Sequence, residues 1–161
     1  MPRSLTVSTM TVSALIIAAC ASGPAFSPPP PAPSTASAPP APGIASEDLV
    51  GRWGFASFHK EADRSRTIAQ ARSQCGQPYI IGRGATGGVM MHLADQRQPT
   101  ELRTKGSADG KRYLGPEGPV GDPGDREIVS FDGRILVMQW IEPEIAGRYG
   151  TAVYVRCAPR A

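Results

Sequence analysis

The chain changes composition abruptly near residue 43, and this break limits where a folded core can form. Ten of its 17 prolines lie before residue 44, whereas all 14 acidic residues and every basic residue except Arg3 lie after residue 43. An uncharged, Pro-rich segment buries too little apolar surface to offset the entropy lost on ordering. We therefore expect one small domain over residues 47–161, which excludes a multidomain enzyme and a polytopic membrane protein.

The charge of the predicted domain is nearly balanced. After residue 43 the chain has 16 basic and 14 acidic residues, which leaves a net charge of +2. Domains that bind nucleic acid usually carry a strongly basic face. We therefore expect no nucleic acid among the partners of this chain.

Residues 1–19 have the properties of an export signal. Arg3 precedes an apolar stretch that is too short and too rich in Ser and Thr for a membrane-spanning helix. The stretch ends in Ile17-Ala18-Ala19-Cys20, which resembles the lipobox of bacterial lipoproteins. The resemblance implies removal of residues 1–19 and attachment of acyl chains to Cys20. The alternative is an ordinary secretory signal followed by an incidental cysteine.

The lipobox resemblance also implies an address in the bacterial cell envelope. Two or more acyl chains hold a protein stably on a lipid bilayer. Ala21 occupies the place where an aspartate would resemble the inner-membrane retention signal, so the outer membrane is the expected location. Residues 20–46 then form a Pro/Ala/Ser-rich tether without charge, which we expect to be disordered and to lean toward polyproline II. Its alternative role is as a ligand for an aromatic groove.

The rest of the chain alternates between short apolar runs and turn residues. Residues 49–56 alternate with a period of two, which is typical of a half-buried strand. Similar short runs follow at residues 79–83, 89–94, 100–105, 111–114, 127–131, 134–141 and 151–157. About eight short antiparallel strands predict a mainly all-β domain, a small meander or barrel.

One helix is expected between the first two strands. Residues 61–73 are rich in helix-forming residues, and opposite charges recur three positions apart at Glu61/Arg64 and Asp63/Arg66. We predict one short, exposed helix there.

Two connections have distinctive turn residues. Asp132-Gly133 separates two strands and favours a type I′ turn, in which both central residues have positive φ. Residues 115–124 repeat glycine at every third position among prolines. This repeat predicts a stiff, exposed, polyproline-like loop, with a recognition loop as the alternative.

Cys75 and Cys157 are the only cysteines outside the lipobox. A pair of cysteines in an oxidising envelope predicts a disulfide. Closing a loop of about 80 residues would stabilise the domain by on the order of 4 kcal/mol. The alternatives are two separate buried thiols, or a redox pair that lacks the usual Cys-x-x-Cys spacing.

No catalytic motif is found in the sequence. His-Glu-x-x-His, Gly-x-Ser-x-Gly and paired-cysteine metal motifs do not occur, so we expect no enzyme, no cofactor and no metal site. His59 with Glu61 and Asp63 would ligate a metal only if that segment were extended. His92 has the opposite strand parity to Met91, so we expect it to face solvent or to cap a barrel end.

A pair of glutamates gives no stronger catalytic signal. Glu142 and Glu144 flank Pro143 in a predicted turn. Two carboxylates suit glycoside chemistry, but their solvation in a turn is the simpler explanation.

The start of the first predicted strand resembles that of several small barrels. Gly51-Arg52-Trp53 is similar to the Gly-x-Trp opening of lipocalin-like barrels and of the barrel inhibitors of bacterial metalloproteases. In those barrels the tryptophan packs across the closed end against a basic residue of the last strand. The resemblance implies a barrel-closing pair of Trp53 and Arg156. The alternative is that Trp53 lines an open ligand site.

Three functions are compatible with these features. The first is a binding module on an envelope lipoprotein, with an envelope protein or a small ligand as its partner. The second is a barrel-type protease inhibitor, which requires residues 44–49 to be free to enter a protease cleft. The third is a hydrolase that uses His92 with Asp95, which predicts a concave pocket around these two side chains. We expect the first.

Overall fold

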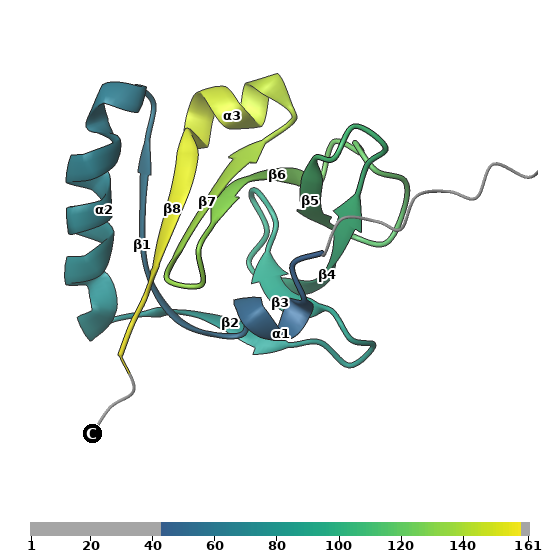
Figure 1. Cartoon of the computed structure of the whole chain (residues 1–161), viewed down its shortest axis with the longest axis horizontal. Coiled ribbons are helices and arrows are strands. Elements are labelled where there is room, and N and C mark those ends of the chain that lie inside the picture. Colours follow the sequence, from purple (N-terminus) through teal and green to yellow (C-terminus); the bar gives the residue numbers. More distant parts are fainter. Residues whose placement is uncertain (1–42, 159–161) are drawn as a thin grey trace, which may run out of the picture. The chain divides into compact units, whose positions relative to one another are not determined.

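The predicted strands are present, and they close into an antiparallel barrel (Figure 1). A computed structural model describes residues 43–158 of the chain. Neighbouring strands pair in sequence order, and β8 pairs with β1 to complete the barrel. The strands are β1 (Gly51–Phe58), β2 (Tyr79–Arg83), β3 (Val89–His92), β4 (Pro99–Gly106), β5 (Arg112–Gly115), β6 (Arg126–Phe131), β7 (Ile135–Trp140) and β8 (Thr151–Arg156). The prediction of a mainly all-β barrel is therefore confirmed.

The hydrophobic core fills the barrel interior because alternate residues of each strand point inward. Its buried members include Leu49, Trp53, Ile81, Val89, Met91, Leu102, Leu114, Ile128, Leu136, Met138 and Tyr154. A second, smaller cluster lies on the outer face of β1 and β8, and it consists of Ala56, Phe58, Ala71, Val153 and Val155. Strand β8 therefore buries both of its faces, and β1 does so around Trp53 and Gly54.

The outer face of β1 and β8 is covered by α2 (Arg64–Ser73), which follows the short 3-10 turn η1 (Glu61–Asp63) (Figure 1). A Cβ atom on Gly54 would lie 1.9 Å from the carbonyl oxygen of Ala71, so only glycine permits this close approach. The helix predicted over residues 61–73 is confirmed. Its two expected charge pairs are also present, at 3.1 Å for Arg64–Glu61 and 2.9 Å for Arg66–Asp63.

The predicted disulfide joins the helical segment to the last strand. Cys75 lies in η2 (Gln74–Gly76), directly after α2, and Cys157 directly follows β8. Their sulfur atoms are bonded, and their Cα atoms are 5.5 Å apart. The bond therefore fixes the end of α2 to the strand that the helix covers.

One end of the barrel is sealed. The short helix α1 (Ser46–Leu49) lies at this end beside β2 (Figure 1), and Leu49 and Trp53 are fully buried. The indole N–H of Trp53 donates a hydrogen bond of 2.9 Å to the carbonyl of Leu49. Ile44 is also buried. Residues 44–49 are thus packed on the barrel, whereas the inhibitor alternative requires them to be free.

The structure places Arg156 against Trp53 at this sealed end. The guanidinium carbon lies 4.2 Å from the centroid of the indole ring. The guanidinium also donates hydrogen bonds to three backbone carbonyls, those of Val50 at 3.1 Å, Gly133 at 2.8 Å and Asp48. Each of the three guanidinium nitrogens of Arg156 therefore donates a hydrogen bond to the backbone.

The turn between β6 and β7 differs from the predicted type I′ turn. Gly133 has a φ of 84°, but among the described residues Asp95 is the only non-glycine residue with positive φ, so Asp132 does not adopt it. Instead, the Asp132 carboxylate accepts backbone N–H bonds from Arg134 at 2.8 Å and Ile135 at 2.6 Å. The hairpin was predicted correctly and its turn type was wrong, because an aspartate side chain can replace the backbone geometry of a tight turn.

The glycine-rich loop after β5 is exposed, but it is not a regular polyproline helix. Gly118 and Gly121 have φ values of 148° and 91°, far from the polyproline value. The buried carboxylate of Asp125 accepts hydrogen bonds from the Gly121 N–H at 2.9 Å and from Lys105 Nζ at 2.7 Å. The predicted exposure is thus observed, whereas the predicted polyproline-like backbone is wrong at these two glycines, where the loop turns so that Asp125 can bind it to the barrel.

A third helix, α3 (Pro143–Tyr149), replaces the turn predicted around Glu142 and Glu144. Pro143 takes the first helical position, where its missing N–H costs no hydrogen bond, and Glu144 lies in the first turn near the positive end of the helix dipole. Helix α3 lies at the end of the barrel opposite α1 (Figure 1). It therefore takes part in shaping that end.

The predicted signal peptide, Cys20 and the tether up to residue 42 lie outside the described residues. Within residues 43–158, no helix is long and apolar enough to cross a membrane.

Candidate functional site

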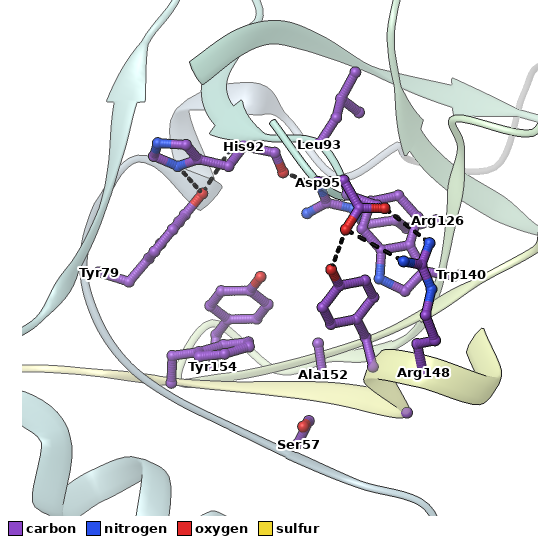
Figure 2. A pocket seen from close by; sticks show the side chains of 14 residues that line it. Ser57, Tyr79, His92, Leu93, Asp95, Arg126, Trp140, Arg148, Ala152 and Tyr154 are labelled. Carbon is purple, nitrogen blue, oxygen red and sulfur yellow. Dashed lines mark hydrogen bonds and ion pairs between the residues drawn. The ribbon is translucent and has the colours of Figure 1, made fainter. Parts of the chain in front are cut away.

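The barrel is hollow at the end where α3 lies. A cavity of about 320 Å³ enters the barrel there, and we call it the mouth cavity (Figure 2). It is lined by Phe55, Ser57, Tyr79, His92, Leu93, Ala94, Asp95, Arg126, Trp140, Arg148, Tyr149, Gly150, Ala152 and Tyr154. These residues come from six strands, from the connection between β3 and β4, and from the end of α3 and the residue that follows it. The site is therefore assembled from segments far apart in the sequence.

Aromatic rings form much of the wall. Phe55 on β1 lies 5.0 Å from the ring of Tyr154 on β8, and Tyr79 on β2 lies 5.7 Å from the same ring, measured between centroids. The strand parity that points Trp53 inward also points Phe55 inward, two residues closer to the mouth. Phe55 is nevertheless 43% exposed, because the cavity rather than other side chains lies against it. The wall thus presents apolar surface to whatever enters.

One cation lies inside this aromatic wall. Arg126, the first residue of β6, is only 3% exposed. Its guanidinium carbon lies 4.0 Å from the centroid of the Trp140 ring, and its Nη2 donates a hydrogen bond to the carbonyl of His92. Its Nε is buried without a hydrogen-bond partner. Within the described residues, no carboxylate lies within ion-pair distance of Arg126.

The acidic neighbours of Arg126 in the sequence are directed elsewhere. Strand alternation points Asp125 and Glu127 away from the cavity. Asp125 pairs with Lys105 at 2.7 Å, and Glu127 pairs with Lys111 at 3.1 Å. The fold therefore neutralises these two carboxylates with lysines and leaves Arg126 as a buried cation.

Tyr154 lines the cavity and is buried, and its hydroxyl points into the open space (Figure 2). Burial raises the pKa of this phenol to about 12, while the nearby charge of Arg126 acts in the opposite direction. The hydroxyl is therefore protonated at neutral pH and can donate a hydrogen bond.

A second charged cluster closes part of the rim. The carboxylate of Asp95, in the connection after β3, accepts hydrogen bonds from Arg148 Nη2 at 2.8 Å and from the hydroxyl of Tyr149, both near the end of α3 (Figure 2). The hydrogen bond from Tyr149, followed by that from Arg148, holds the pKa of Asp95 below its usual value. The hydrogen bond to Asp95 also raises the pKa of Tyr149. The cluster links α3 to the opposite side of the mouth.

His92 and Asp95 both line the cavity, so a concave pocket does surround the pair considered for hydrolysis. His92 is exposed at the barrel end, as expected, and its Nδ1 lies 3.2 Å from the hydroxyl of Tyr79. Within the described residues, no hydrogen bond joins His92 to Asp95 or to Ser57, and the hydroxyl of Tyr79 is the side-chain partner of His92. Nor do three or more potential metal ligands cluster anywhere in residues 43–158.

Several residues of the mouth cavity were not identified from the sequence. Arg126 was placed just outside its strand, although it shares parity with the buried Ile128 and this pattern marks an inward-facing arginine. Arg148 and Tyr149 were missed because α3 was expected to be a turn. Trp140 and Tyr154 appeared only as parts of strands.

Comparisons with protein families, with curated proteins and with solved structures found no match to this chain. The closed antiparallel barrel of eight strands agrees with the lipocalin-like architecture that Gly51-Arg52-Trp53 resembles.

Proposed function

We propose that this chain is an envelope lipoprotein whose barrel binds a small, largely apolar molecule in the mouth cavity. The observation that carries the proposal is the contrast between the two barrel ends, one filled by Trp53 and Leu49 and the other hollow and lined by aromatic rings. A pocket of about 300 Å³ or more with apolar walls and a few polar groups is typical of small-molecule sites.

Transfer of apolar surface from water provides the binding energy. Each Å² of apolar area removed from water contributes roughly 25 cal/mol, so a ligand that covers the rings of Phe55, Tyr79 and Tyr154 gains most of its affinity from them. The barrel holds these rings in place without a ligand, because neighbouring rings and strands already contact them. Little conformational entropy is then lost on binding.

The amino-terminal segment gives this binding domain its location. Acyl chains on Cys20 would hold the protein on the outer membrane, and the Pro-rich tether would keep the barrel away from the lipid surface. Cys20→Ser removes the thiol that the acyl chain needs, so the variant is expected to leave the membrane fraction or to remain unprocessed. Unchanged partitioning of the variant into detergent would contradict this part of the proposal.

Binding in the mouth is tested with N-phenyl-1-naphthylamine, an uncharged probe whose fluorescence increases in an apolar site. The protein is the full chain carrying Cys20→Ser, so that no attached acyl chain competes for the cavity. Ser57 is exposed and lines the cavity, and Ser57→Phe fills part of this space. We expect the affinity for the probe to fall about tenfold or more, as the loss of a few contacts would produce.

The matched control is Val129→Phe, which adds an equally large ring at a position that is 47% exposed and does not line the cavity. Its affinity for the probe should equal that of the starting protein. Equal binding by both variants, or no binding by the starting protein, would contradict the proposed site.

A further inference from the structure

The mouth cavity contains a charge that binding of an apolar molecule does not explain. Arg126 is 3% exposed, lies against the cavity and has no carboxylate partner within the described residues. A buried charge is costly unless an opposite charge or several hydrogen bonds compensate it. Here one hydrogen bond to the His92 carbonyl, the nearby neutral hydroxyl of Tyr154 and the face of Trp140 compensate it only in part, and Nε has no partner.

We propose that the mouth cavity is specific for amphiphilic acids, with the oxyanion of the ligand paired to Arg126 and its apolar body against the aromatic wall. This inference rests on the proposed function, because it assigns the chemical class of ligand for the same cavity. A guanidinium pairs well with oxyanions such as carboxylates, and the pairing strengthens where water is excluded.

A second group in the cavity suits an oxyanion. The hydroxyl of Tyr154 points into the space beside Arg126 (Figure 2), and it keeps its proton at neutral pH, as its raised pKa requires. It is thus able to donate a second hydrogen bond to the same oxyanion. Because Tyr154 is buried in the barrel, this bond would form away from bulk water.

The carboxylate at the rim does not oppose an anionic ligand strongly. Asp95 is held by Arg148 at 2.8 Å and by the hydroxyl of Tyr149, so a cation compensates its charge locally. Asp125 and Glu127 point out of the cavity and pair with lysines. Counting the charges that face the cavity, one positive charge on Arg126 remains without a partner.

Two fluorescent probes that differ in one charged group test the inference. 8-Anilinonaphthalene-1-sulfonate carries a sulfonate on the same ring framework as N-phenyl-1-naphthylamine. The sulfonate makes the first probe more soluble in water, so an uncharged cavity would prefer the second. We expect the full chain with Cys20→Ser to bind the sulfonate about tenfold more tightly than the uncharged probe, as expected of a hydrogen-bonded charge pair.

The decisive variant is Arg126→Gln, which removes the charge and keeps a donor for the His92 carbonyl. Its affinity for the sulfonate should fall about tenfold or more, while its affinity for the uncharged probe should change less than about twofold. Arg66→Gln on the exposed face of α2 removes the same charge far from the cavity and should alter neither affinity. Arg126→Lys retains the charge and should recover part of the lost affinity.

Competition experiments identify the ligand body and need no variant. Naphthalene-1-carboxylate should displace the sulfonate probe, whereas naphthalene-1-carboxamide should not. Decanoate in place of the naphthoate distinguishes an aliphatic acid from an aromatic one. If Arg126→Gln does not fold, the ratio of the two probes and this competition still decide the matter.

The outcomes separate this inference from the proposed function. Equal affinity for both probes, unaffected by Arg126→Gln or by exchange of carboxylate for carboxamide, would retain the binding cavity and overturn its specificity for acids. Failure of both probes to bind would overturn the cavity as a binding site and this inference with it.

Discussion

The two ends of the barrel are built around the same pair of residue types and use it differently. At the sealed end Arg156 lies 4.2 Å from the ring of Trp53, and at the mouth Arg126 lies 4.0 Å from the ring of Trp140. Arg156 donates to three backbone carbonyls, whereas Arg126 donates to one and has a buried Nε without a partner. An arginine stacked on a tryptophan therefore closes the barrel end where backbone carbonyls accept all its hydrogen bonds. Where they do not, the same arrangement is a candidate site for binding a ligand.

The largest difference in stability is expected between alanine substitutions of the two tryptophans, Trp53 and Trp140. Trp53 is fully buried at the sealed end, so Trp53→Ala removes a large core ring and should lower the free energy of unfolding by about 3–5 kcal/mol. Trp140 is only partly buried beside a cavity, so Trp140→Ala should cost clearly less. Urea unfolding of both variants measures the difference. Equal losses of unfolding free energy in the two variants would contradict the distinction between a filled end and a hollow end.

Removal of the disulfide should lower the stability of the barrel without changing the affinity of the mouth cavity for a ligand. Removal of both sulfurs by Cys75→Ser with Cys157→Ser should lower the free energy of unfolding by about 4 kcal/mol, because the bond closes a loop across a sequence separation of 82 residues. Neither cysteine lines the mouth cavity, so the folded variant should bind N-phenyl-1-naphthylamine as before. A large loss of probe affinity in the folded variant would show that the two ends are coupled.

The smallest effect on stability is expected from substitution of Asp95 at the rim of the mouth cavity. Asp95→Asn weakens the bonds to Arg148 and Tyr149, which are exposed, so the melting temperature at neutral pH should fall only slightly. Its hydrogen bonds to Tyr149 and Arg148 hold the pKa of Asp95 in the folded protein below the ordinary value of an aspartate. Its stabilising contribution is thus complete above that value and disappears as the pH falls through the lowered folded-state pKa.

Thermal unfolding of the Asp95→Asn variant beside the unsubstituted protein checks this sign. The difference in melting temperature should vanish in acid. A difference that grows as the pH falls would contradict the assignment of the rim cluster.

The strands and the sealed end were predictable because they follow local rules. Period-two alternation predicts the strands, and the Gly-x-Trp resemblance implies the contact between Trp53 and Arg156. The helix α2 was predictable from opposite charges three positions apart. The disulfide was predictable for a different reason, because only two cysteines lie outside the lipobox and they can pair only with each other within the domain.

The mouth was harder to predict because it depends on how the barrel closes. The charge balance of the mouth cavity depends on which side of β6 faces inward. The predicted strand began at residue 127, one residue too late, so Arg126 was not recognised as an inward-facing strand residue. The helical conformation of α3 was concealed by Pro143, which is typical both of a turn and of a first helical residue. Pairing of Asp125 with Lys105 and of Glu127 with Lys111 requires the register of β4, β5 and β6.

Arg156 is expected to stabilise the folded barrel, whereas Arg126 is proposed to bind the anionic group of a ligand. Urea unfolding of Arg156→Gln and Arg126→Gln, with and without 8-anilinonaphthalene-1-sulfonate and followed by far-ultraviolet circular dichroism, tests both halves together. Arg156→Gln should lower the midpoint without ligand and retain the upward shift that ligand binding produces. Arg126→Gln should leave the midpoint nearly unchanged and lose that shift. Equal destabilisation by the two substitutions, with the ligand shift preserved in both, would contradict the account.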